Sequence, residues 1–514
     1  MTHTEVPVLT DATVPVGLID AFWGYDSALL TNDVAALDDY FEVSADTLRG
    51  DGQNIVRGWE QISRFRASRT AIPTRAISTL HVRVLADDLV FTTAEVKSGA
   101  GSKGQQTQLW RKRGGEWRIL AAHVTAPGKP IDTAVWRVVG APLLPATASG
   151  PLSGDTVAVK DLFAVAGYAI GGGVRAYLPT ADTQTQHSAA VAGLLEAGAS
   201  ITGIAQTDQF AYSVAGQNRD YGTPGNTTAP DRIPGGSTSG PAVAVARGEV
   251  SIGLGTDTAG SIRVPASYQG LWGIRTSLGL VSTRGLLPLA PSFDTVGWIT
   301  RDGETLARVS ASQLPASIHD AAGTRLVVIP ALLQLASPAM RDAAERATEL
   351  LGVDTLAASI DVESWFSAFR TVQAFEAWSE HGDWITAHPD ALGPEIGARF
   401  AAASSVSQQD FAGARVVVQQ ARTTLNTLLA GRTLVLPTTA DLPPLLNADA
   451  ATIDDDRART LRLTSLASLA GLPAVTAPVL NVDGLPSGLS FVGQVRTDKS
   501  LIALARRAAE TILS

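Results

Sequence analysis

The sequence contains no cysteine, which excludes disulfides, thiolate metal ligands and cysteine nucleophiles. It has no block of like charge and a net charge of −9, which argues against nucleic acid and anionic membranes as partners. The chain does not open with a basic segment followed by an apolar run, so we expect no signal peptide. No apolar stretch reaches about 18 residues, so we expect no membrane-spanning helix. These absences predict a soluble cytoplasmic protein.

Two reactive residue types are scarce. Of the seven histidines, none lies in an obvious catalytic setting. The chain has six lysines, and Lys160 is the only one between Lys129 and Lys499. Because Lys160 follows the apolar run "TVAV", burial is expected to lower its pKa and to make it a general base. The alternative is a structural lysine that pairs with Asp161 at the end of a strand.

The chain of 514 residues is too long for one ordinary core, and its composition changes along its length. Residues 1–126 combine helical stretches with alternating strands and a "KRGGEW" hairpin turn, which predicts a small α+β domain. Residues 127–156 have the Pro-, Gly- and Ala-rich composition of a linker. Over residues 157–514, apolar strands alternate with Ala-rich helices, which predicts an α/β fold with a large mixed, mainly parallel sheet flanked by helices. Within it, residues 303–430 are mostly helical in pattern and are interpreted as a pocket-forming region.

The run "GTDTAGSIRVP", residues 255–265, places small and polar residues directly after an apolar strand. Such a run suits a phosphate loop or a nucleophile loop. The motif G-x-x-x-x-G-K-[ST] is absent and no lysine lies near the run, which disfavours nucleotide binding. No G-x-S-x-G, S-x-x-K or K-T-G motif is present, but a Ser–His–Asp arrangement stays open because triads assemble from distant positions.

A second Gly- and Ser-rich run, "IPGGSTSGPAVAVA", covers residues 233–246. Taken alone, it favours an ordinary helix start after a turn, with Ser237, Thr238 or Ser239 as the cap. Pro241 suits the first turn of that helix.

Together, "VAVKDLF", "PGGSTSGPAVAVA" and "GTDTAGSIRVP" resemble the amidase signature family, and the resemblance covers about residues 150–510. It implies hydrolysis of a linear amide or ureido C–N bond through an acyl-enzyme. Carried over by motif, Ser261 is the nucleophile, Ser237 the bridging serine and Lys160 the base of a Ser-Ser-Lys triad. In the family the bridging serine follows a cis peptide, here at Gly236. The stretch "QNRDYGTPGN" resembles indoleacetamide hydrolases, and "DTAGS" is also the form seen in allophanate hydrolases. Aryl amides and small carboxylated ureas therefore both stay open as substrates.

The small residues beside Ser261 are expected to expose successive backbone N–H groups to one oxygen, as an oxyanion hole does. The N–H groups concerned belong to Thr258, Ala259, Gly260 and Ser261. Ala259 stands where the commoner family pattern has glycine. Asp257 and Arg263 flank the loop, and we expect them to pair and brace it.

Residues 15–125 resemble the cystatin-like cone of NTF2-like and SnoaL-like proteins, and more closely a family of 1,3-dicarboxyurea amidohydrolases. The matching stretches include "FWGYDSALLTNDVAALDDYF" and "TLRGDGQNIVRGWEQISRFRASR". The resemblance implies a pocket inside the cone with catalytic Tyr25 and Arg49, where an arginine binds a carboxylate bidentately. Further candidates for this pocket are Arg66, Arg69 and His123. The alternative is a non-catalytic domain that dimerises or supports the amidase, and a homodimer through this domain is expected.

Two other functions stay open, an amidotransferase subunit that passes ammonia to a partner and a scaffold without catalysis. No metal or organic cofactor is implied, and the expected partner is a small-molecule amide or carboxyurea substrate. Five aromatic residues at helical spacing suit either the core or an aromatic substrate pocket. They are Trp365, Phe366, Phe369, Phe375 and Trp378.

Overall fold

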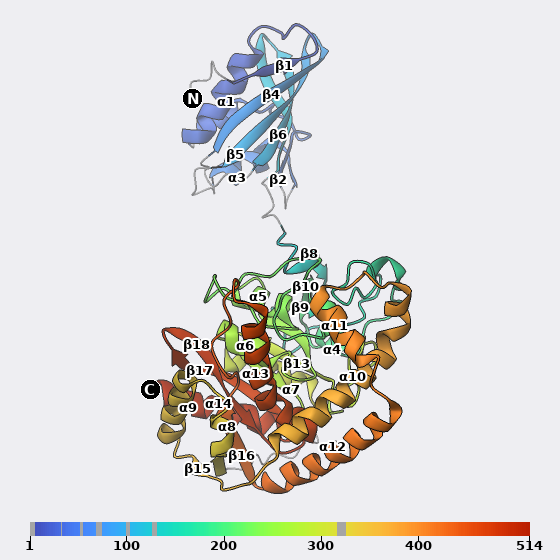
Figure 1. The fold of residues 1–514 in the computed structure, drawn as a ribbon. Coiled ribbons are helices and arrows are strands. Elements are labelled where there is room, and N and C mark those ends of the chain that lie inside the picture. Colours follow the sequence, from blue (N-terminus) through green and yellow to red (C-terminus); the bar gives the residue numbers. More distant parts are fainter. Residues whose placement is uncertain are drawn as a thin grey trace. The chain divides into compact units, whose positions relative to one another are not determined.

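A computed structural model describes residues 6–31, 33–51, 55–67, 75–98, 103–125, 131–315 and 325–514. The chain divides into two compact units, Met1–Pro130 and Ile131–Ser514 (Figure 1). Within the described ranges, the helices are all too short or too polar to cross a membrane.

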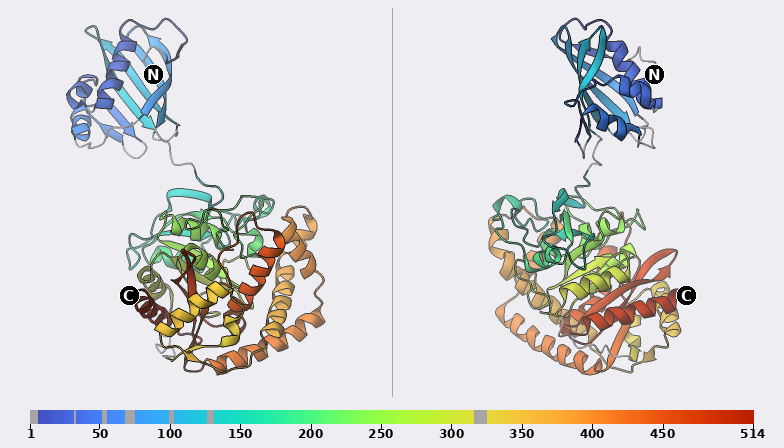
Figure 2. Two further views of the ribbon diagram at one scale, coloured as in Figure 1. Left: turned by 60° about the vertical axis from the view of Figure 1, so that its left-hand side comes forward. Right: turned by 180° about the vertical axis from the view of Figure 1, so that it is seen from behind.

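The first unit packs three helices on one face of a seven-stranded sheet, as the blue segments in Figure 2 show. Its helices are α1 (Leu18–Thr31), α2 (Val34–Asp39) and α3 (Trp59–Ala67). Its strands, in chain order, are β1 (Val8–Thr10), β2 (Leu48–Asp51), β3 (Ile55–Arg57), β4 (Arg75–Ala86), β5 (Leu89–Ser98), β6 (Lys103–Arg113) and β7 (Glu116–Thr125). In the sheet they lie side by side in the order β1-β4-β5-β6-β7-β2-β3. Adjacent strands are antiparallel except at β1–β4 and β2–β7. The predicted small α+β domain is confirmed.

The predicted hairpin is present between β6 and β7. Arg113 pairs with Glu116 across a two-residue turn. Gly114 and Gly115, which form the turn, have φ of 58° and 92°. Two successive positive φ angles are the geometry that matches the twist of a tight hairpin, and glycine adopts them without a steric cost.

The second unit is built on an eleven-stranded sheet. In spatial order its strands are β15 (Asp354–Thr355), β14 (Arg325–Val328), β16 (Arg432–Pro437), β18 (Leu485–Val492), β17 (Ala474–Val482), β12 (Trp272–Arg275), β13 (Thr295–Thr300), β11 (Ile252–Asp257), β9 (Thr156–Lys160), β10 (Ser200–Ala205) and β8 (Trp136–Leu144). The mixed α/β fold is confirmed, but the sheet is not mainly parallel. Six neighbouring pairs are antiparallel and four are parallel. The reason is that pairs such as β17–β18 are joined without a crossover helix, which permits antiparallel pairing.

Helices cover both faces of this sheet. They are α4 (Ala189–Glu196), α5 (Ser239–Ala246), α6 (Arg263–Gln269), α7 (Gly303–Gln313), α8 (Pro330–Leu333), α9 (Pro338–Leu350), α10 (Val362–Ala387), α11 (Pro394–Ala403), α12 (Gln408–Leu428), α13 (Ala450–Ala470) and α14 (Asp498–Leu513). Helices α4, α7, α9 and α14 share one apolar core with the sheet, whereas α5 and α6 pack on its other face. Helices α10 to α12, the orange segments in Figure 1, belong to a second core with α13. Residues 303–430 are thus mainly helical, although β14 and β15 extend the sheet edge.

The predicted linker, residues 127–156, differs from the structure. Strand β8 falls within it and pairs antiparallel with β10 at the edge of the large sheet. Val135 and Trp136 are buried there, and this apolar contact outweighs the linker-like composition. Residues 127–130 lie outside the described part of the chain.

Strand β9 has a special place in the chain path. The chain leaves β9 for β10 on one side and later crosses to β11 on the other, and both neighbours run parallel to it. In open α/β sheets, ligands bind beyond the carboxyl ends of strands where the order reverses in this way. Lys160 ends β9 and Asp257 ends β11, so both candidate residues lie at this position.

Candidate active site

Lys160 is fully buried on the face of the sheet that α5 covers. Along β9, Val159 packs in the core opposite α5, whereas Ala158 packs against α5. Because side chains alternate along a strand, Lys160 lies on the same side as Ala158. Its Nζ donates hydrogen bonds to Ser237 Oγ and Thr256 Oγ1, each at 2.8 Å. The lysine therefore joins two segments that are distant in the sequence.

The alternative partner of Lys160 is engaged elsewhere. Asp161 forms an ion pair with Arg137 at 3.0 Å and accepts a hydrogen bond from the Gly171 N–H at 3.0 Å. The pairing of Lys160 with Asp161 is therefore wrong.

Burial lowers the pKa of Lys160 to about 7, and the carboxylates of Asp208, Asp294 and Asp257 oppose this shift. A lysine with this pKa is neutral in a large fraction of molecules near pH 7. Neutral Nζ has a lone pair and can accept a proton from a hydroxyl that it contacts. In this structure that hydroxyl belongs to Ser237 or Thr256.

Ser237 lies in the loop before α5, after a cis peptide bond with Gly236, as the family resemblance implies. The Ser237 carbonyl accepts a hydrogen bond from Thr207 Oγ1 at 2.8 Å. Thr238 is the N-cap position of α5, but no side chain caps this helix, so the interpretation of the run as an ordinary capped helix start is wrong. The Thr238 N–H instead donates to the Ser261 carbonyl at 3.1 Å, which brings the two serine-containing loops together.

Ser261 is buried in the loop between β11 and α6. Its hydroxyl forms no hydrogen bond with any described residue, so it is not hydrogen-bonded to Ser237 Oγ. The structure therefore brings Lys160 and Ser237 into direct contact and sets the Ser261 loop beside them, with the Ser261 hydroxyl unengaged.

The backbone of this loop differs from the prediction at one residue. The N–H groups of Thr258, Ala259 and Ser261 donate no hydrogen bond within the described ranges. The Gly260 N–H, in contrast, donates to Asp257 Oδ1 at 2.9 Å. The expectation that Gly260 supplies an oxyanion donor is therefore wrong, because a carboxylate three residues earlier in the turn accepts its proton.

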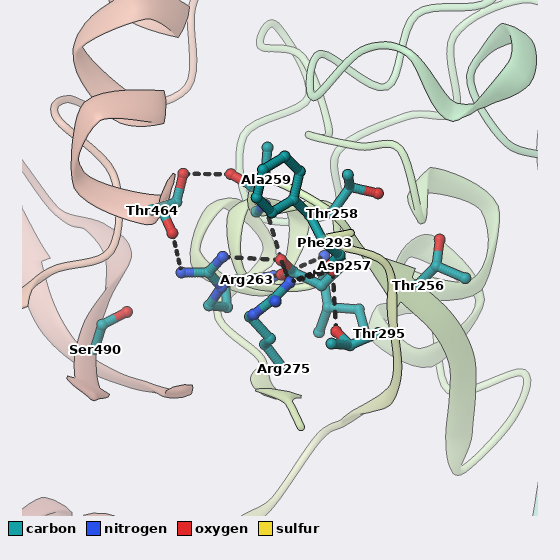
Figure 3. A network of polar contacts seen from close by, with 12 residues as sticks. Thr256, Asp257, Thr258, Ala259, Arg263, Arg275, Phe293, Thr295, Thr464 and Ser490 are labelled. Carbon is teal, nitrogen blue, oxygen red and sulfur yellow. Dashed lines mark hydrogen bonds and ion pairs between the residues drawn. The ribbon is translucent and has the colours of Figure 1, made fainter. Parts of the chain in front are cut away.

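The expected ion pair between Asp257 and Arg263 is present (Figure 3). Arg263 Nη2 lies 2.8 Å from Asp257 Oδ1, and Arg263 Nε donates to Oδ2 at 3.0 Å. Burial alone would raise the pKa of Asp257, but the guanidinium groups of Arg263 and Arg275 hold it far below its usual value. The carboxylate stays ionised and fixes the start of α6 beside the loop that contains Ser261.

Several residues of the site were missed by the sequence analysis. They are Thr256, Asp208, Asp294, Arg275 and Thr464. Asp208 carried a usable signal, because "QTDQ" is a polar run directly after the apolar strand β10, as Lys160 follows β9. Thr464 lies within α13, directly before the stretch "SLASLAGLPAV" that resembles the family, but nothing in its local sequence marked it as part of the site.

In the first unit, Tyr25, Arg49 and Arg66 are buried between the helices and the sheet. Arg66 Nη1 contacts Asp38 Oδ1 at 3.3 Å, and its guanidinium lies over the Phe41 ring. His123 is exposed on the opposite face of the sheet, so its assignment to the inner pocket is wrong. The reason is a shift of register between Ile119 and Ala121 of β7, after which Ala122 and not His123 points inward. The candidate Arg69 lies outside the described residues.

The aromatic residues of α10 divide between core and periphery. Trp365, Phe366 and Phe369 are buried in the second core, as the core interpretation predicts. Phe375 and Trp378 are only partly buried, and Phe375 stacks on Phe411 with ring centroids 4.1 Å apart.

Comparisons with known proteins match both units. Residues 141–327 match the Amidase family, and residues 8–129 match the AtzH-like family. Amidase 1 of Arabidopsis thaliana is 35% identical over 405 residues, which cover 71% of this chain and 95% of that protein. Chloroplastic outer envelope protein 64 of Arabidopsis thaliana is 31% identical over 391 residues, which cover 70% of this chain and 66% of that protein.

A solved structure agrees with these matches. It is described as an unexpected vestigial protein complex that reveals the evolutionary origins of an s-triazine catabolic enzyme. It is 27% identical, with a TM-score of 0.65, and the match covers 71% of this chain and 85% of that one. The chain therefore belongs to the amidase signature family of hydrolases that act on amide C–N bonds, and it carries an AtzH-like domain over residues 8–129.

Proposed function

We propose that the second unit hydrolyses a linear amide or ureido C–N bond through an acyl-enzyme on Ser261. The contact that carries this proposal is the 2.8 Å hydrogen bond between Lys160 Nζ and Ser237 Oγ. A serine hydroxyl is a weak nucleophile until a nearby base takes its proton, and a buried lysine with a pKa of about 7 suits that task.

In the proposed reaction, Ser261 Oγ attacks the substrate carbonyl while its proton passes to Ser237 and the Ser237 proton passes to Lys160. The tetrahedral oxyanion faces the unpaired N–H groups of the Ser261 loop. The same relay then runs in reverse and protonates the leaving nitrogen, so the C–N bond breaks and an acyl-enzyme remains. Water attacks the acyl group with the help of the relay, and the acid is released.

The test is a panel of amide and carboxyurea substrates with ammonia detection, run on the wild type and on Ser261→Ala. We expect the wild type to release ammonia or an amine from at least one substrate and Ser261→Ala to release none. A matched control is Ser404→Ala, which removes an exposed hydroxyl at the end of α11. If Ser261→Ala keeps the activity of the control, Ser261 is not the nucleophile.

For the first unit we propose a site for a carboxylated urea such as 1,3-dicarboxyurea. Two buried donors support it, since Arg66 Nη2 and Gln108 Nε2 have no hydrogen-bond partner among the described residues. A bound carboxylate would supply the acceptors that such buried donors require. The test is the release of carbon dioxide from 1,3-dicarboxyurea by full-length Ser261→Ala, which removes the proposed amidase reaction. Loss of one carboxyl group leaves both nitrogens in the monocarboxyurea product, so no ammonia is expected from this variant. Loss of carbon dioxide release in Tyr25→Phe would support the site, and a wild-type rate in that variant would refute the role of Tyr25.

We also propose that the outer face of the first sheet joins two copies of the chain. Leu48, Ile55 and Phe91 are exposed on it, and they line a hollow of about 230 Å³ together with Leu109. Beside it, Arg83 and Asp11 form an exposed ion pair at 3.7 Å. An apolar centre with both charge signs at its edge is complementary to a second copy of itself in a two-fold dimer.

A further inference from the structure

The peptide group between Ala259 and Gly260 is held at both of its ends, and Figure 3 shows the contact of its Ala259 carbonyl with Thr464. Thr464 Oγ1 donates a hydrogen bond to the Ala259 carbonyl, and the Gly260 N–H donates to Asp257 Oδ1 at 2.9 Å. A trans peptide carries its C=O and N–H on opposite sides. The two hydrogen bonds therefore fix the plane and the direction of this group next to Ser261.

The two groups that hold the peptide are themselves connected through Arg263. Arg263 Nη2 lies 2.8 Å from Asp257 Oδ1, and Arg263 Nη1 donates to the Thr464 carbonyl at 2.8 Å. The contacts form a closed ring that links the nucleophile loop to α6 and to α13. All of its side chains are buried, so water does not compete for these hydrogen bonds.

Helix α13 packs directly on the loop at this point. Gly260 has a φ of +133°, and a Cβ added there would lie 3.0 Å from Thr464 Oγ1. The Thr464 hydroxyl also lies 3.1 Å from the Thr460 carbonyl, one turn earlier in α13. A side chain at position 260 would therefore press on Thr464, and glycine lets the loop and the helix approach this closely.

We propose that Thr464 is a positioning residue for the oxyanion hole. Its hydroxyl holds the Ala259–Gly260 peptide with the N–H directed at Asp257, and this orientation leaves the N–H groups of Ala259 and Ser261 free to face the substrate oxygen. The inference rests on the proposed function, because the donors act only if Ser261 attacks a carbonyl. Donors that are already oriented stabilise the developing charge without reorganisation, so a loosened peptide lowers kcat and leaves KM unchanged.

Two pairs of variants isolate the hydroxyl. Wild type and Thr464→Val differ by an oxygen in place of a methyl group, and Thr464→Ser and Thr464→Ala differ by the oxygen alone. The first readout is kcat and KM on the amide found in the substrate panel. The second is the rate of labelling by an alkyl fluorophosphonate, followed by intact mass. In that reaction a bond forms between Ser261 Oγ and phosphorus, fluoride leaves, and the phosphoryl oxygen takes the position of the oxyanion.

We expect the loss of the hydroxyl to lower kcat and the labelling rate by about tenfold or more within each pair, with KM and the melting temperature nearly unchanged. Thr464→Ser should stay close to the wild type. Equal kcat and labelling rates within both pairs would overturn the role of Thr464, as would a rise in KM with kcat unchanged. If the wild type takes no label on Ser261, the proposed nucleophile fails, which is a result distinct from failure of the Thr464 inference. The Ser and Ala pair keeps the test decisive if Thr464→Val does not fold.

Discussion

Lys160 Nζ lies 2.8 Å from Ser237 Oγ, although 77 residues separate them in the chain. The contact exists because β9 ends where the loop before α5 returns to the same face of the sheet. It places a base of altered pKa against a hydroxyl rather than against a carboxylate. The chemistry proposed for the second unit depends on this single contact.

Replacing Lys160 with arginine should abolish amide hydrolysis. Arginine stays protonated at any pH at which the protein is folded, so it cannot accept the proton of Ser237. The measurement is ammonia release under saturating substrate. Lys499→Arg is the matched control, because Lys499 is partly exposed and its Nζ donates a hydrogen bond to the Pro315 carbonyl, far from Lys160 in the chain. An active Lys160→Arg enzyme would show that another group is the base.

The rate should rise with pH through the pKa of Lys160. Burial lowers this pKa to about 7, so the protonated, inactive lysine predominates below that pH and the neutral base above it. We therefore expect kcat/KM to fall on the acid side with a midpoint near pH 7. A midpoint near pH 10 would mean that burial does not lower the pKa of Lys160.

Asp208 offers a way to move that midpoint. Of the three carboxylates that favour the ammonium form of Lys160, Asp208 has the largest effect. It accepts a hydrogen bond from the Gly216 N–H at 3.0 Å. Asp208→Asn removes the charge and keeps a similar shape, so the pKa of Lys160 should fall further. The acid limb of the profile should then shift to lower pH. An unchanged profile in a folded variant would contradict the electrostatic role of Asp208.

The candidate catalytic residues were easier to find in the sequence than the residues that surround them in the structure. Lys160, Ser237 and Ser261 lie in local motifs with unusual composition, and local composition is visible in one sequence. Thr464 and Arg275 reach the nucleophile loop from α13 and β12, and contacts between distant segments leave no local pattern. The misplaced His123 shows a related limit, because a one-residue change of register in β7 turns a side chain to the other face of the sheet. The antiparallel pairs of the large sheet were missed for the same reason, since pairing joins strands that need not be adjacent in sequence.

Replacing Asp257 with asparagine should destabilise the second unit. The Asp257 carboxylate forms ion pairs with Arg263 and Arg275, both buried, and the substitution removes this shared negative charge. Breaking a buried ion pair in this way costs about 3–5 kcal/mol. We expect a clear fall of the melting temperature in thermal unfolding. The control is Asp354→Asn in the exposed pair with Arg325, where little change is expected.

Charged substitutions on the outer face of the first sheet should separate the proposed dimer. Ile55 is 80% exposed there, so a glutamate at this position should not disturb the fold of one copy. In the dimer it would bury a charge in an apolar contact, which is strongly unfavourable. Light scattering after size exclusion should give twice the mass of one chain for the wild type and the mass of one chain for Ile55→Glu. The control is the same change at another exposed residue, Val416→Glu in α12 of the second unit, which should leave the mass unchanged.

Gly260→Ala should be more harmful than the left-handed backbone alone explains. Gly279 also has a positive φ, +71°, but a Cβ there would meet no atom within 4 Å, so Gly279→Ala measures the backbone cost by itself. At Gly260 the new methyl would also press on Thr464 Oγ1 and on Val264, each about 3 Å away. We therefore expect Gly260→Ala to lower the melting temperature at least as much as Gly279→Ala does. In addition, Gly260→Ala should remove most of kcat. Equal effects of the two substitutions on kcat would mean that the fit between α13 and the nucleophile loop has no part in catalysis.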